Sequence, residues 1–206
     1  MKKVAVVLIA ILALVVGGAG AQEQPFTALW SHDGIIALWN ESRAHFTVEM
    51  VGKNVQPTDL GGLALVIDGK LIQIVVSDPS EFPAGGSDSA SLLQRHREWE
   101  STHWSEQIGQ QLVPQTLTHP GVNAPAQMWE LRFPRELRSD GKVQLATTLF
   151  VTQAIGDRVL TLSRPVMVGE DEARAKDYLA AVLGSLEVSA QPISVEQVQA
   201  KIQAGP

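Results

Sequence analysis

One short stretch of the chain concentrates side chains that could bind a metal ion. His96, Glu100 and His103 lie within HREWESTHW, residues 96–104, and imidazole and carboxylate groups are common ligands of zinc and iron. Glu100 and His103 form a Glu-x-x-His pair of the kind found in di-iron bundles, although such a site needs two pairs and two further glutamates. The zincin pattern His-Glu-x-x-His is absent, because Arg97 stands where its glutamate would be.

The same spacing indicates an amphipathic helix. At about 100° per residue, His103 falls within about 20° of His96 around the helix axis, on the side that also carries Leu92 and Trp99. The two histidines are two turns apart, about 10.5 Å along the axis, whereas histidines that share zinc on a helix lie one turn apart. We therefore expect a packed or partner-facing helix, and metal binding by His96, Glu100 and His103 is the alternative.

No other stretch carries a catalytic motif. A serine hydrolase of the Gly-x-Ser-x-Gly type is not indicated, because GGSDSA at 85–90 lacks the final glycine and precedes a helix. The Gly-Lys pairs of the chain do not have the spacing of a phosphate-binding loop. The sequence therefore predicts no catalytic residue and no cofactor.

Three of the five tryptophans are candidates for a partner-binding surface. Trp99 and Trp129 fall on expected inward faces, so core packing accounts for them. The sequence does not decide whether Trp30, Trp39 and Trp104 pack in the core or lie on a contact surface, because tryptophan is also enriched in interaction hot spots. Core packing is the alternative for each of these three.

Alternating and apolar runs separated by short turns predict an antiparallel sheet of about six strands. The clearest hairpin is LALVIDGKLIQIVV, residues 63–76, because Asp68-Gly69 favours the positive φ angles of a two-residue turn. A second pair of strands is expected in QLATTLFVTQAIGDRVLTLS, residues 144–163, joined at 155–158. Further strands are predicted in FTALWSHDGIIALW, FTVEMV and MWELRF.

Two helices are expected to flank this sheet. The first runs from about Ser91 to Ile108, after a Pro-, Gly- and Ser-rich loop, and either Asp88 or Ser89 can cap it. The second spans roughly Glu170–Leu183, with an acidic first turn and Gly184 as its stop. The sequence thus predicts one α+β domain over residues 22–190, followed by a tail, residues 191–206, with a weak short helix.

The N-terminus resembles a secretory signal peptide. Lys2 and Lys3 precede thirteen apolar residues, Val4 to Val16, and Ala19-Gly20-Ala21 provides a small-residue cleavage site. Cleavage after Ala21 predicts a periplasmic or secreted bacterial protein without stable membrane insertion, and an uncleaved anchor is the alternative.

The remaining chain has 14 basic and 22 acidic residues, a net charge of −8, which argues against nucleic acid as a partner. With no cysteine in the chain, lipid attachment at a cysteine is excluded.

The order of elements from about Phe46 to Val188 resembles the PsbP-like α/β/α sandwich, shared by photosystem extrinsic proteins, Ran-binding import factors and bacterial envelope families. The resemblance lies mainly in TLFVTQAIGDRVLTLSRPV and EARAKDYLAAVLGSLEV, and also in LLQRHREWESTHW after an early hairpin. It implies a non-enzymatic protein that docks onto a larger assembly through a sheet edge or a loop surface. We therefore expect a binding or assembly-assisting envelope protein whose partner is another envelope protein or a small ligand. A metal-binding or metal-dependent hydrolytic envelope protein is the alternative.

Overall fold

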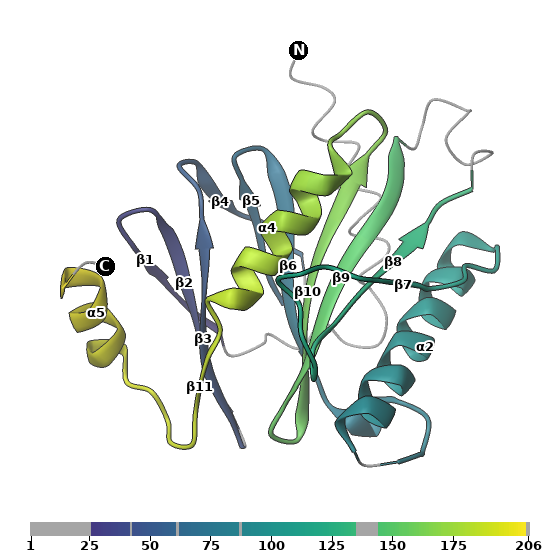
Figure 1. Ribbon diagram of the computed structural model, residues 1–206. Coiled ribbons are helices and arrows are strands. Elements are labelled where there is room, and N and C mark those ends of the chain that lie inside the picture. Colours follow the sequence, from purple (N-terminus) through teal and green to yellow (C-terminus); the bar gives the residue numbers. More distant parts are fainter. Residues whose placement is uncertain (1–25, 42, 61, 87, 135–143, 205–206) are drawn as a thin grey trace.

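The structure is a computed structural model that describes residues 26–204 except positions 42, 61, 87 and 135–143. The predicted signal segment, residues 1–21, lies outside the described residues. The predicted α+β class is confirmed, since the strands form antiparallel sheets and the helices cover their faces (Figure 1). The sequence predicts one sheet of about six strands, whereas the described strands form two sheets, one of four strands and one of seven.

The four-stranded sheet joins the first three strands of the described chain to one of its last segments. Its order is β1-β2-β3-β11, and every neighbouring pair is antiparallel. Among the described strands, β1 and β11 therefore form the two edges of this sheet. The bounds are Phe26–Trp30 for β1, Gly34–Glu41 for β2, Ala44–Val51 for β3 and Glu187–Ser189 for β11.

The seven-stranded sheet is built around the two longest strands. Its order is β4-β5-β6-β10-β9-β8-β7, again antiparallel throughout. The bounds are Val55–Pro57 for β4, Leu63–Ile67 for β5, Lys70–Ser77 for β6, Gln115–Leu117 for β7, Gln127–Arg132 for β8, Leu145–Ile155 for β9 and Arg158–Met167 for β10.

Both predicted hairpins of this sheet are confirmed. Asp68 and Gly69 adopt φ angles of 48° and 78° between β5 and β6, the left-handed values that a two-residue turn requires. Gly156, with φ of 59°, turns the chain between β9 and β10. A Cβ atom at Gly156 would lie 2.6 Å from the carbonyl oxygen of Arg43, so both the backbone angle and the available space favour glycine.

The two predicted helices are present with slightly different ends. Helix α2 (Ser89–Ile108) begins after Asp88, whose side chain accepts a hydrogen bond from the backbone N–H of Ser91, and ends at left-handed Gly109. Helix α4 (Glu172–Gly184) includes Gly184, the residue expected to end it. Its C-cap is Ser185, whose Oγ accepts a hydrogen bond of 2.8 Å from the backbone N–H of Glu49.

The main core lies where the inner faces of both sheets meet α4. Helix α4 contacts β3 on one side and β9 and β10 on the other (Figure 1). Helix α2 covers the opposite face of the seven-stranded sheet, which therefore has helices on both faces. The large, fully buried side chains of the inner layer include Trp39, Phe46, Met50, Ile74 and Leu160.

The C-terminal segment, predicted as a tail, contains a helix that packs on the fold. Helix α5 (Val195–Ala204) places Val198 against Ile36 and Leu38 on the outer face of the four-stranded sheet. A short 3-10 helix, η1 (Pro79–Glu81), precedes the loop to α2. In the described part of the chain, no helix has the length and apolar character needed to cross a membrane.

Candidate functional site

The three predicted metal ligands all lie on α2. His96 is buried against β10, where its Nε2 lies 3.2 Å from Thr161 Oγ1. Burial lowers the pKa of His96 to about 4, so the imidazole is neutral near pH 7. Its Nδ1 has no hydrogen-bond partner among the described residues.

Glu100 and His103 point to neighbours on their own helix. Glu100 Oε1 accepts a hydrogen bond of 2.8 Å from Trp104 Nε1. Burial raises the pKa of Glu100, while the bond from Trp104 and the charge of His103 act in the opposite direction. The His103 ring stacks on Trp99, with centroids 6.1 Å apart and planes 15° from parallel.

These contacts give the metal hypothesis no geometric support. Across the residues that the structure describes, no group of three or more His, Cys, Asp or Glu side chains is placed to hold a metal ion. The His96 ring instead joins an aromatic cluster beneath α2, with its centroid 5.1 Å from that of Phe82 and 6.1 Å from that of Trp99. The stretch HREWESTHW thus contributes to packing of α2 on the sheet.

The three candidate surface tryptophans have different environments. Trp39 and Trp104 are 2% and 8% exposed, so burial in the core removes them from a contact surface. Trp39 packs against both Phe26 and Phe46, which also contact each other, and Trp104 contacts the edge of the Phe133 ring. Trp30, at the end of β1, is 63% exposed and is available for contact.

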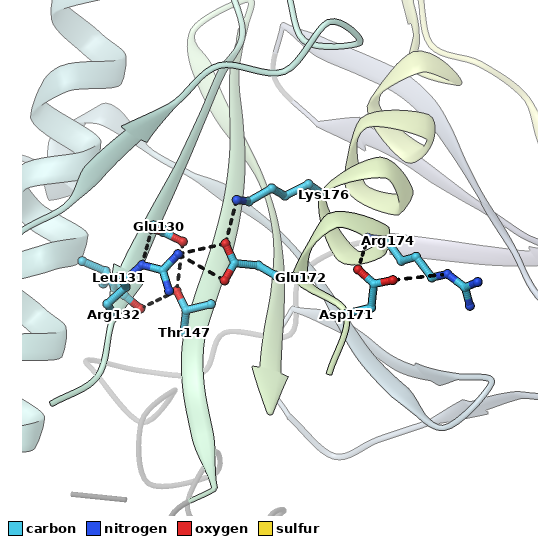
Figure 2. Close-up of polar contacts among 8 residues, drawn as sticks. All are labelled: Glu130, Leu131, Arg132, Thr147, Asp171, Glu172, Arg174 and Lys176. Atoms are coloured by element: carbon cyan, nitrogen blue, oxygen red, sulfur yellow. Dashed lines mark hydrogen bonds and ion pairs between the residues drawn. The ribbon is translucent and has the colours of Figure 1, made fainter. Parts of the chain in front are cut away.

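A charged network that the sequence does not reveal ties α4 to β8 (Figure 2). Arg132 donates to Glu130 Oε1 at 2.6 Å and to the two carboxylate oxygens of Glu172 at 2.9 and 3.1 Å. Lys176 donates to Glu172 at 2.6 Å. Burial alone would raise the pKa of Glu172, but the bonds from Lys176 and Arg132 lower it below its ordinary value.

Glu130 is the unexpected member of this network. Strand alternation in MWELRF predicts Trp129, Leu131 and Phe133 on one face, with Glu130 on the other. The alternation is correct, but Glu130 is only 1% exposed, because α4 covers the second face of the sheet. Arg132 compensates its charge, so the geometry indicates a structural ion pair rather than a catalytic acid.

A buried arginine lies on the same face of the sheet as Glu130. Arg164 of β10 is buried beneath α4, with its guanidinium carbon 5.9 Å from the centroid of the Tyr178 ring. Burial lowers the pKa of Arg164, and Tyr178 partly opposes this shift. The Tyr178 hydroxyl donates to the carbonyl oxygen of Val51 at 3.2 Å, and burial raises the pKa of Tyr178 to about 12. This contact fastens α4 to β3.

The outer face of the four-stranded sheet carries a groove of about 440 Å³. We call it the β11–α5 groove. Its floor is formed by β2 and β3, and its walls by β11 with the following loop and by α5. Among its lining residues are Ile36, Thr47, Glu49, Glu187, Val188 and Lys201. Its volume lies within the range of about 300–1,000 Å³ common for ligand pockets.

Sequence patterns do not predict this groove, because its floor and its walls lie far apart in the chain. Asn40 of β2 fixes the loop before α5 in place: its side-chain nitrogen donates to the Ile193 carbonyl at 2.6 Å, and its oxygen accepts from the Ile193 N–H at 2.9 Å. The apolar positions of SVEQVQAKIQ indicate a helix, but they do not specify which sheet face it covers.

The fold thus defines an α+β protein with two antiparallel sheets. No protein-family model matches the chain, and no curated protein matches it. Among solved structures, the chain is similar to the solution structure of cyanobacterial PsbP (CyanoP) from Synechocystis sp. PCC 6803, with a TM-score of 0.39 and 11% sequence identity. The similarity covers 84% of this chain and 98% of that one. This similarity does not show membership of the PsbP family.

Proposed function

We propose that this protein is an exported, non-enzymatic module of the bacterial envelope that binds, or helps to assemble, another envelope protein. The observation that carries the proposal is the exposure of Trp30 on an edge strand. Strand β1 reads FTALW and contains no charged residue and no proline, the features that usually protect an edge from pairing with other chains. At 63% exposed, Trp30 has the side chain most typical of an interaction hot spot.

The position of Trp30 supports contact along the sheet edge. Its strand partner is Ile35, which belongs to the inner core. Because directly paired residues point to the same face of a sheet, the Trp30 side chain lies on the apolar inner face of β1, at the edge of the sheet. Trp39, which pairs with Phe26 at the other end of β1, is covered by Phe26 and Phe46. A partner strand beside β1 would extend the sheet and cover Trp30 in the same way.

Site-specific photo-crosslinking in cells tests this function. Trp30 is replaced by p-benzoylphenylalanine in protein with a C-terminal tag, and adducts are identified by mass spectrometry. Val113, which is 66% exposed in the segment after α2, receives the same replacement as a control. We expect one dominant envelope protein from position 30 and not from position 113. Absence of an adduct, or the same adducts from both positions, would count against a binding role for this edge.

Export is tested separately by cell fractionation and intact mass. A mature start at Gln22 in the periplasm or medium is the expected result. Retention of residues 1–21 on a membrane-bound chain would instead support the uncleaved anchor.

A further inference from the structure

The β11–α5 groove exists because α5 covers only part of a sheet face. Val198 of α5 packs on Ile36 and Leu38, which are residues of β2. The neighbouring β3 side chains on that face, Thr47 and Glu49, are left as the floor of the groove. A strip of the sheet about as wide as β3 and β11 therefore remains open beside α5.

The charges in the groove favour a cationic occupant. Lys201 lines it together with two glutamates, Glu49 and Glu187, and Lys201 already forms an ion pair with Glu187. Glu49 accepts a hydrogen bond of 3.2 Å from Ser31 Oγ. Within the described part of the chain, no cation lies at ion-pair distance from Glu49. A lysine or arginine side chain above the floor would therefore gain a carboxylate partner without displacing an existing one.

The wall of the groove favours a polypeptide over a small amine. All three residues of β11 line the groove, and β11 is an edge of the four-stranded sheet, so one row of its backbone N–H and C=O groups pairs with no described strand. An extended segment can satisfy such a row by strand addition. Val188, 55% exposed in the middle of β11, pairs with inner-face Phe46, so its side chain lies on the other face of the sheet from the groove floor. A strand added beside β11 would cover this side chain as well.

We propose that the β11–α5 groove binds an extended segment of a partner protein that carries a lysine or arginine next to apolar side chains. The cation lies over Glu49, and the backbone of the segment runs along β11. This inference rests on the proposed binding function and deepens it, because it adds the chemistry of the recognised segment and a second contact on the edge opposite β1.

Selection from a phage-displayed library of random 12-residue peptides, against the purified protein, tests the recognised chemistry. An enriched peptide is then synthesised with a fluorescent label, and its Kd is measured by anisotropy for the wild type and three variants. Glu49→Gln removes the floor charge at nearly constant shape. Val188→Lys places a cation on the exposed inner face of β11, beside the strand edge along which the segment would run. Glu41→Gln is the control, because it removes the same charge from an exposed position at the end of β2, outside the groove.

We expect enriched peptides to share a basic residue within an apolar, extended sequence. Glu49→Gln and Val188→Lys should each weaken binding by about ten-fold or more, and added salt should weaken binding to the wild type. Glu41→Gln should keep the wild-type Kd within about two-fold. Circular dichroism melts establish that each variant is folded. Failure to enrich any peptide, enrichment of acidic peptides, or equal Kd values for all four proteins would overturn the inference.

The crosslinking experiment separates this inference from the proposed function. If the adduct at position 30 forms equally with wild-type protein and with Val188→Lys, and the Kd values do not differ, the binding function stands and the groove is not its recognition site. If no adduct forms while the peptide measurements follow the expected order, the groove inference stands and the role assigned to β1 fails.

Discussion

His96 Nε2 lies 3.2 Å from Thr161 Oγ1, across the interface between α2 and β10. The histidine belongs to the stretch in which the sequence offers metal chemistry, and its hydroxyl partner is 65 residues further along the chain. A neutral imidazole buried at this place makes the packing of α2 dependent on pH.

Acidification should therefore destabilise the protein through His96. Between about pH 6.5 and pH 4 the unfolded chain binds a proton at His96 that the folded chain does not, so the free energy of unfolding falls as pH falls. The full loss of unfolding free energy from His96 is about 3 kcal/mol.

His96→Gln cannot titrate at this position, so its unfolding free energy, measured with denaturant across this pH range, should depend less on pH than that of the wild type. Glu100 acts in the opposite direction because burial raises its pKa, so the informative quantity is the difference between the two profiles. Parallel profiles would contradict the prediction.

Removal of Arg132 should cost far more stability than removal of Arg174. Arg132→Ala leaves the buried Glu130 carboxylate without its cation, and we expect a loss of about 2–3 kcal/mol, reduced from the fully buried case because Arg132 is half exposed. Arg174 pairs with Asp171 on the exposed surface of α4 (Figure 2), so Arg174→Ala should change stability by less than about 0.5 kcal/mol. Urea unfolding measures both, and similar losses would indicate that the Glu130 carboxylate is not dependent on Arg132.

The two hairpin glycines should respond differently to alanine. Gly69→Ala places a Cβ at positive φ with no atom within 4 Å, at a cost of about 1–2 kcal/mol. Gly156→Ala has the same backbone penalty and also brings the Cβ to 2.6 Å from the Arg43 carbonyl oxygen, which should add about 1–3 kcal/mol. Thermal unfolding should therefore rank Gly156→Ala as the less stable variant, and the reverse order would show that the approach of Arg43 is not rigid.

Two tryptophan substitutions separate core packing from surface contact. Trp104→Ala removes a side chain that packs on Phe133 in the layer under α2, and should cost about 3–5 kcal/mol. Trp30→Ala should cost less than about 1 kcal/mol, because the side chain is largely exposed. If Trp30→Ala proves as destabilising as Trp104→Ala, Trp30 would be a structural residue and not a free contact.

Chelation should leave the protein unchanged. Because no group of three or more His, Cys, Asp or Glu side chains in the described part of the chain is placed to hold a metal ion, treatment with EDTA should shift Tm by less than about 1 °C. Elemental analysis of protein purified without added metal provides the direct measurement. Stoichiometric zinc or iron that disappears in His103→Ala would favour the metal-binding alternative.

The sequence by itself determined the local structure of this protein. Asp68-Gly69 specifies its turn through the φ angles that these residues tolerate, Asp88 specifies the start of α2, and the period-two alternation around Trp129 specifies which side chains share a face. These features depend on backbone sterics and on hydrogen bonds between residues close in the chain, so a single sequence carries them.

Only the tertiary structure decided which faces are covered, and therefore which chemistry is accessible. Glu130 and Arg132 alternate with apolar residues in the same way that solvent-exposed residues do, yet Glu130 is buried, and its partner Arg132 bonds to Glu172 of α4. Trp30 and Trp39 both follow Ala-Leu in the chain, yet one is exposed on an edge strand and the other is buried against two aromatic rings. Glu49 lies at the floor of a groove because α5, about 150 residues later, covers β2 and stops short of β3. Burial and long-range pairing depend on how distant segments pack, and no local pattern in the chain records that packing.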